Sequence, residues 1–275
     1  MLRAPAGLTE RAMDDAQIKE MVRARYGSIA ATASEASCCA PAASSCCGPE
    51  TASHDKARRM GYSEGELAAA PEGANLGLGC GNPQAIAAMR PGEVIVDLGS
   101  GAGFDCFLAA RQVGDAGQVI GVDMTHEMLK KARDNAARIG ARNVEFRLGE
   151  LEHLPIADNT ADVVISNCVV NLVPSKAQVF REALRVLKPG GRLAVSDVIN
   201  IAPLPAELRA DPTLLCGCVA GAAPAERIEA WLREAGFVNV HVTPNFESRE
   251  MVESWASGRG VENYIAPAMV EARKP

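Results

Sequence analysis

The chain has 275 residues, of which 48% are hydrophobic and 23% are charged, and its net charge is −6. This length predicts one full α/β domain with a substantial core, together with some additional structure. An acidic balance without a basic tract argues against nucleic acid or an anionic membrane as a partner. No apolar run reaches the roughly 18 residues that a membrane span needs, and no secretory signal is visible at the start, so we expect a cytoplasmic protein.

The first 70 residues are predicted to form a helix and a flexible segment. Apolar side chains recur at helical spacing over residues 9–30. Residues 31–53 are small and polar and contain two cysteine pairs, which is typical of a flexible segment. We therefore separate an N-terminal region, residues 1–70, from a domain formed by residues 71–275. The pairs are Cys38-Cys39 and Cys46-Cys47.

The domain is predicted to be α/β, because strand patterns alternate with helical patterns. After a loop around Cys80 and a short helix ending near Met89, the predicted strands are 94–98, 118–122, 143–148, 162–166, 192–198 and 238–243. The predicted helices are 104–113, 125–140, 175–188 and 224–235. Such alternation indicates right-handed βαβ units in a Rossmann-like parallel sheet. A last apolar run, 264–270, is expected to add an antiparallel edge strand, and residues 199–224 and 245–263 are expected to be substrate-side insertions.

A glycine-rich corner at residues 96–105 (VDLGSGAGFD) joins the first strand to a helix. Alternating glycines let the backbone approach a ligand closely. The dinucleotide fingerprint G-x-G-x-x-G requires a third glycine where this chain has Phe104 or Cys106, depending on the register. A dinucleotide is therefore disfavoured. A small adenosine cofactor without phosphates fits better, and S-adenosylmethionine (SAM) is the leading candidate.

Ligands of open α/β sheets bind at the carboxyl ends of the strands, which locates the predicted cofactor site. Asp97 is placed to take the cationic α-amino group of the methionyl moiety, and Asp123 to take the ribose diol. Residues 149–151 follow the third strand, where an adenine edge could be read, and Asn167 ends the fourth strand. The predicted cofactor-binding residues are Asp97, Gly99, Ser100, Gly101, Gly103, Asp123, Met124, Gly149, Glu150, Leu151 and Asn167.

The nine cysteines are expected to be thiols, because a reducing compartment disfavours structural disulfides. Cys106 is interpreted as a small buried hydrophobe. Cys80 in a glycine-rich loop, Cys168 at a strand end and Cys218 in an insertion could converge above the cofactor. Three thiolates suit a soft, three-coordinate centre with a lone pair, such as arsenic or another thiophilic element. For Cys216 the roles of bystander, ligand and relay thiol all stay open.

Two resemblances follow from these residues. The segment 97–103 with Asp123 and the Lys-Pro-Gly-Gly turn at 188–191 resembles class I SAM-dependent methyltransferases over roughly residues 90–245. That resemblance implies a seven-stranded, mostly parallel sheet with helices on both faces and an antiparallel last strand. Four strings closely resemble bacterial arsenite methyltransferases: 77–83 (GLGCGNP), 122–125 (VDMT), 166–172 (SNCVVNL) and 217–222 (GCVAGA).

The second resemblance implies that Cys80, Cys168 and Cys218 bind arsenic(III), and that its lone pair accepts the methyl group of SAM. It also implies that one cysteine of an N-terminal pair takes part in early binding or in a disulfide relay, for which Cys47 is favoured. Arsenite or its thiol adducts would be the substrate, with glutathione or thioredoxin as the reductant. No general base is needed, because the arsenic lone pair carries no proton. A monomer is the default expectation.

Two alternatives stay open. One is a carbon- or oxygen-methyltransferase acting on a quinone- or lipid-like molecule, which would leave the three cysteines unexplained. The other is a protein that sequesters a metalloid or zinc without converting it, although no cysteine spacing is the C-x-x-C typical of zinc.

Overall fold

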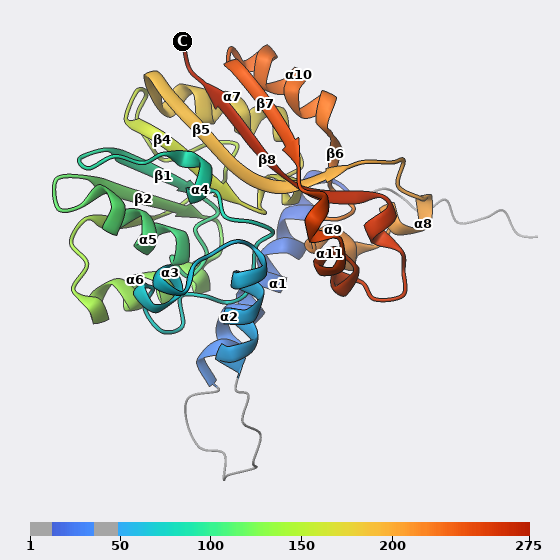
Figure 1. The fold of residues 1–275 in the computed structure, drawn as a ribbon, viewed down its shortest axis with the longest axis horizontal. Helices are drawn as coiled ribbons and strands as arrows, with labels where there is room; N and C mark the ends of the chain where they lie inside the picture. Colours follow the sequence, from blue (N-terminus) through green and yellow to red (C-terminus); the bar gives the residue numbers. More distant parts are fainter. Residues whose placement is uncertain (1–12, 36–48) are drawn as a thin grey trace, which may run out of the picture.

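The computed structural model describes residues 13–35 and 49–275, which form a mixed sheet with helices on both faces (Figure 1). Along the sheet the strand order is β3-β2-β1-β4-β5-β8-β7, and the short strand β6 pairs with β5. All neighbouring pairs are parallel except those made by β8. The strands are β1 Val94–Leu98, β2 Gln118–Asp123, β3 Val144–Leu148, β4 Ala161–Asn167, β5 Leu187–Asn200, β6 Ala223–Pro224, β7 Val238–Pro244 and β8 Ile265–Arg273.

The helices between the strands confirm the predicted α/β alternation. The four predicted helices of the domain, 104–113, 125–140, 175–188 and 224–235, are all present, and each starts and ends within two residues of the predicted position. The α-helices are α1 Asp15–Glu35, α2 Pro49–Arg59, α3 Glu64–Ala69, α4 Gln84–Ala87, α5 Phe104–Val113, α6 His126–Ile139, α7 Lys176–Val186, α8 Ala206–Arg209, α9 Pro212–Cys216, α10 Ala225–Ala235 and α11 Arg249–Trp255. Three short 3-10 helices cover Val170–Leu172, Phe246–Ser248 and Val261–Asn263.

The last predicted strand is antiparallel as expected, but it is not at the edge of the sheet. β8 lies between β5 and β7, with Ala268 opposite Asp197 and Val270 opposite Val242. Six of the residues in β8 are buried, and they lie on both faces of the strand, so it needs a neighbour and a covering layer on each side. Exposed residues dominate β7, which suits the edge position that it takes.

The Lys-Pro-Gly-Gly turn is the beginning of β5 rather than a loop before it. Gly190 has φ +77°, and the pairing register with β4 shifts at this point. The Gly190 N–H donates to the carbonyl of Lys274, and the Lys274 N–H donates to the carbonyl of Gly191. With these bonds β5 begins at Leu187, which is five residues before the predicted start at residue 192.

The N-terminal region contains more helix than the sequence predicts. α1 continues to Glu35 and α2 begins at Pro49, so both ends of the expected flexible segment 31–53 are helical. The small residues there include alanines, which favour helix more than any other residue type. The four cysteines of the pairs, Cys47 among them, lie outside the described residues. α1 contacts α6 and α9, and the division of the chain at residue 70 stays a prediction.

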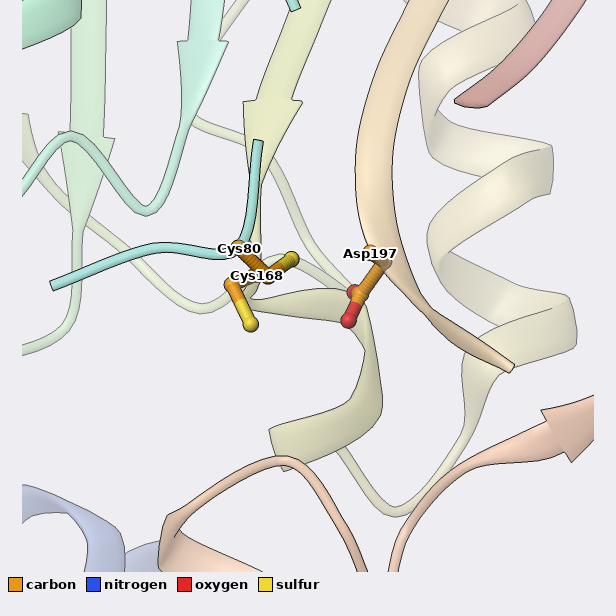
Figure 2. A group of neighbouring side chains, drawn as sticks. All are labelled: Cys80, Cys168 and Asp197. Atoms are coloured by element: carbon orange, nitrogen blue, oxygen red, sulfur yellow. The ribbon is translucent and has the colours of Figure 1, made fainter. Parts of the chain in front are cut away.

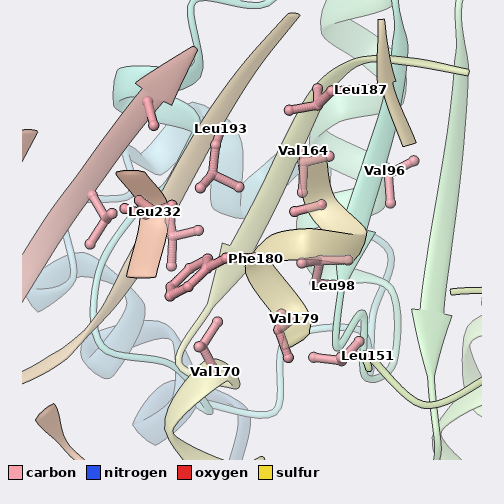
Figure 3. Packing of buried hydrophobic residues seen from close by; sticks show 14 of the residues in the cluster. Val96, Leu98, Leu151, Val164, Val170, Val179, Phe180, Leu187, Leu193 and Leu232 are labelled. Atoms are coloured by element: carbon pink, nitrogen blue, oxygen red, sulfur yellow. The ribbon is translucent and has the colours of Figure 1, made fainter. Parts of the chain in front are cut away.

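Two apolar cores lie on the two faces of the sheet, because neighbouring side chains of a strand point to opposite faces. In β1, Ile95 packs with α5 and α6, whereas Val96 and Leu98 pack with α7 and α10. Figure 3 shows the second of these cores, with Phe180 of α7 at its centre. Across the described ranges, no helix combines the length and apolar character needed to cross a membrane.

Replacing the ring of Phe180 should destabilise the fold strongly. This side chain is only 3% exposed, so Phe180→Ala should lower the free energy of unfolding by about 3–5 kcal/mol through lost burial and a cavity. Phe246, which is 64% exposed, provides the matched control, and Phe246→Ala should change the free energy by less than about 0.5 kcal/mol. Urea unfolding followed by circular dichroism measures both. Equal effects of the two substitutions would contradict the packing described here.

Candidate active site

A cavity of about 410 Å³ opens at the carboxyl ends of β1, β2 and β4, where the sequence places the cofactor. α1, α2 and the insertion that carries α9 also contribute to its wall. The predicted cofactor residues that line it are Asp97, Gly99, Ser100, Gly101, Asp123, Met124, Leu151 and Asn167. Gly103, Gly149 and Glu150 do not line this cavity.

Glu150 faces α1 instead of the main cavity. Its carboxylate lies 2.7 Å from the Lys19 ammonium and 3.6 Å from the Arg23 guanidinium. Together with Gly149 it borders a second, more open cavity between α1 and α6. The hydrogen bond with Lys19 holds the pKa of the Glu150 carboxyl below its usual value. The proposed contact of Glu150 with adenine stays a prediction.

Glycine is needed for different structural reasons at different positions of the glycine-rich corner. A Cβ at Gly99, where φ is +72°, would lie 2.5 Å from Val169, and a Cβ at Gly103 would lie 2.7 Å from Phe107. Both positions therefore require glycine for packing. At Gly101 the nearest atom to a Cβ would be a sulfur 4.0 Å away, so this backbone borders open space in the cavity wall. The Gly101 N–H donates to the Asp123 carboxylate over 2.9 Å, which fixes the turn to the end of β2.

Asp97 is a buried acid whose charge is not neutralised by a neighbouring cation. It is 2% exposed, and no basic group of the described residues forms an ion pair with it. The Cys106 thiol donates to it over 3.1 Å. Burial raises the pKa of Asp97 well above its usual value, and the charges of Asp105 and Asp123 add to this effect. A cationic ligand would lower the pKa of Asp97 again, because an opposite charge favours the ionised carboxylate.

Three predicted thiols meet beside this cavity. In Figure 2, Cys80 and Cys168 lie side by side, with Asp197 of β5 facing them. The two sulfur atoms and a carboxylate oxygen of Asp197 all lie within 4.8 Å of one another. The Cys218 thiol donates to the carbonyl of Cys168 over 2.9 Å. Hydrogen bonds with the Cys218 and Cys80 thiols raise the pKa of Cys168 well above its usual value, so Cys168 is the central thiol.

Strained backbone conformations position two of the thiols. Cys168 has φ +59° and Cys218 has φ +63°, in the left-handed region that residues with a side chain rarely adopt. Such strain is typical of functional sites, where the surrounding structure holds it. Cys168 and Cys218 line the cavity, as does Cys216, whereas Cys80 is buried behind its wall. Burial raises the pKa of the Cys80 thiol.

Asn167 holds the loop of Cys80 as well as lining the cavity. Its side-chain oxygen accepts from the Cys80 N–H over 3.1 Å, and its side-chain nitrogen donates to the carbonyl of Gly81 over 2.8 Å. The same nitrogen contacts the hydroxyl of Tyr62, which donates to Asp105 over 2.7 Å. Asn167 therefore connects the end of β4 to the thiol loop and to the start of α5.

Sequence reasoning missed Asp197, Asn171 and Tyr62. Two backbone N–H groups and the side chain of Asn171 hold the Asp197 carboxylate. Burial nevertheless raises its pKa to about 6. A position near the carboxyl end of a predicted strand was the available signal for Asp197. Tyr62 belongs to the loop before α3, and no motif indicates it.

Comparisons with known proteins show to which family the chain is related. A methyltransferase-domain family profile matches residues 89–236. The chain is 52% identical over 267 residues to an arsenite methyltransferase of Halobacterium salinarum, covering 95% of this chain and 68% of that protein. An arsenite methyltransferase of Aquipseudomonas alcaligenes is 45% identical over 168 residues, 58% of this chain and 48% of its own length. This chain therefore spans about two thirds of the first relative and about half of the second.

A solved structure shows the same relationship in three dimensions. The arsenic(III) S-adenosylmethionine methyltransferase of Chlamydomonas reinhardtii superposes with a TM-score of 0.58 at 32% identity, covering 80% of this chain and 73% of that one. Its fold is the class I methyltransferase fold that the strand order of this sheet also displays. This chain belongs to the arsenite methyltransferase family of class I SAM-dependent methyltransferases.

Proposed function

We propose that this protein methylates arsenic(III), which Cys80, Cys168 and Cys218 hold at the wall of the cofactor cavity. The observation that carries the proposal is the meeting of these thiols around Cys168, next to the glycine-rich corner. Thiolates are preferred ligands of thiophilic elements, and three of them leave the arsenic lone pair available. A quinone or lipid methyltransferase would give these three thiols no role.

The residues around the cavity fit SAM. Asp97 lacks a counter-cation, which suits the α-amino group, and Asp123 at the end of β2 suits the ribose hydroxyls. Gly101 lies between them, and its backbone borders open space in the cavity wall, where a ligand can approach closely. When bound, SAM supplies a methyl group on a positively charged sulfur. The protein's part is to orient that group and to exclude water.

The thiols would load the substrate by exchange. A cysteine sulfur forms a bond to arsenic, a carrier thiol leaves, and the cysteine proton goes to the departing sulfur, so no electrons are gained or lost. The histidines within the described residues do not line the cavity, which agrees with an acceptor that has no proton to remove. Cys80 and Cys218 both neighbour Cys168, so arsenic bound to these thiols would lie at the cavity wall.

Methylation formally raises arsenic from the trivalent to the pentavalent state. Two adjacent thiols can return two electrons by forming a disulfide, and Cys168 has two neighbouring thiols, Cys80 and Cys218. Glutathione or thioredoxin would then reduce the disulfide, which places the reaction in the reducing cytoplasm. Cys47 is proposed as the additional relay thiol, on the resemblance alone.

Product analysis tests the function. The protein is incubated with arsenite, glutathione and SAM carrying a labelled methyl group, and arsenic species are separated by liquid chromatography with mass spectrometry. We expect labelled methylarsenicals together with S-adenosylhomocysteine, and neither product when arsenite is omitted. Tight arsenic binding without any labelled arsenical would instead identify a sequestering protein.

A further inference from the structure

Three cations line the active-site cavity without a charged partner. They are Arg25 of α1 and Lys56 and Arg59 of α2. All three side chains are exposed, and no carboxylate of residues 13–35 and 49–275 forms an ion pair with any of them. Lys19, a fourth cation at the wall, is already engaged by Glu150 and Glu152, at 2.7 and 3.1 Å. We call Arg25, Lys56 and Arg59 the cationic rim.

The rim lies on the two helices that border the cavity opposite the sheet. α1 and α2 both lie below the sheet in Figure 1, and both contribute to the same cavity wall. Lys56 and Arg59 are three residues apart on α2 and therefore share one side of it. Four acids also line the cavity, and none forms an ion pair with the rim: Asp97, Asp105, Asp123 and Glu152. The rim therefore keeps its three positive charges separate from the acids of the cavity.

Arg25 connects the rim to the thiols. The hydroxyl of its neighbour Tyr26 donates to the carbonyl of Cys216 over 3.2 Å. Burial raises the pKa of the Cys216 thiol, and the charge of the Arg25 guanidinium opposes that rise. Cys216, Cys168 and Cys218 line the same cavity. The rim and these thiols therefore border the same cavity, and a ligand held there has both within one enclosed space.

We propose that the cationic rim binds the carboxylates of the thiol compound that delivers arsenic, a carrier of the glutathione type. This inference rests on the proposed function, since it assigns the carrier for the same site. Two guanidinium groups match carboxylates with paired hydrogen bonds, and Lys56 adds a point charge. Exchange then releases the carrier as a free thiol when a cysteine sulfur replaces it on arsenic.

The decisive variant is Arg25→Gln, Lys56→Gln and Arg59→Gln combined, compared with wild type in the full-length protein. Arsenite is presented either with glutathione, which is anionic, or with 2-mercaptoethanol, which is neutral. With glutathione the KM for arsenic should rise about tenfold or more in the variant, the loss of at least one charge-assisted contact. With 2-mercaptoethanol it should rise less than about twofold, because that thiol has no carboxylate to lose.

A binding measurement gives a readout independent of catalysis. S-methylglutathione carries the carboxylates but cannot exchange on arsenic, and titration calorimetry should detect its binding to wild type and a loss of about tenfold in the variant. The binding should also weaken as salt rises, because the rim is exposed. Arg111→Gln is the matched control: Arg111 is an exposed cation of α5 away from the cavity, and this change should leave carrier binding unaltered.

Two results would overturn the proposal. Equal rises in the KM for arsenic with both thiols would mean that the rim does not bind the carrier's carboxylates. A raised KM for SAM with an unchanged preference between thiols would assign the rim to the cofactor's own carboxylate. If no thiol supports methylation, the proposed function fails. Loss of S-methylglutathione binding in the variant would still support the rim in that case, and unchanged binding would refute it.

Discussion

Cys168→Ser should reduce arsenite methylation by about 100-fold or more, while SAM affinity stays within about twofold. Altering a partner that only supports a ligand commonly costs about 10–100-fold, so removing the central ligand should cost at least as much. Serine keeps the size of the side chain but replaces a soft sulfur with a hard oxygen, which binds arsenic(III) poorly. Cys168 is the thiol that contacts both Cys80 and Cys218, so no neighbouring sulfur can replace it.

The measurement separates chemistry from folding. Initial rates of methylarsenical formation are compared with SAM affinity from calorimetry, on protein whose unfolding midpoint is checked. Cys106→Ser is the matched control, because Cys106 is buried outside the thiol cluster and a serine hydroxyl can still donate to Asp97. Its rate should change by less than about threefold. A Cys168→Ser protein that retained full activity would refute the arsenic site.

Asp97→Asn should weaken SAM binding by roughly 100-fold or more. Breaking a buried charge pair costs about 3–5 kcal/mol, which corresponds to at least about two orders of magnitude in affinity. Asparagine preserves the shape of the side chain and removes only the charge that is expected to meet the α-amino group. Because Asp97 is 2% exposed, water cannot substitute for the missing charge.

Calorimetry at several pH values provides a second readout. Burial and the neighbouring acids raise the pKa of Asp97, so wild-type affinity should weaken as the pH falls through this raised value and the carboxyl becomes neutral. Asp97→Asn should show a smaller dependence. Asp115→Asn, at an exposed acid in the loop after α5, should leave both affinity and pH dependence unchanged. Unaltered SAM affinity in Asp97→Asn would exclude the proposed contact.

Local patterns were sufficient to predict the βα units of the fold. The helix at Phe104–Val113 has the predicted ends, because the glycine corner before it and Gly114 after it are strong local signals. The position of β8 could not be read in the same way. An apolar run predicts burial, but whether a strand lies inside a sheet depends on pairing partners distant in sequence, such as Asp197 opposite Ala268.

In the candidate site, too, residues with a local sequence signal could be predicted, and residues that depend on tertiary structure could not. Cys80, Cys168 and Cys218 could be predicted because thiols in loops at strand ends are unusual, and their convergence follows from the topology. Asp197 could not be predicted as their neighbour, because an acid near a strand end has no local signature of facing sulfur. The ion pair of Glu150 with Lys19 also joins segments 131 residues apart, so its orientation toward α1 depends on tertiary structure.

The interior position of β8 has a consequence for folding during synthesis. Among the described strands, β7 pairs only with β8, and one side of β5 is covered by β8 along nine residue pairs. A nascent chain that ends before residue 265 therefore carries an unpaired β7 and an open flank on β5, at the strand that holds Asp197. Such exposed edges favour association with other chains. The wall that we propose to bind arsenic is thus complete only after residues 265–273 have been made, and chaperone protection should matter most while residues 238–273 emerge from the ribosome.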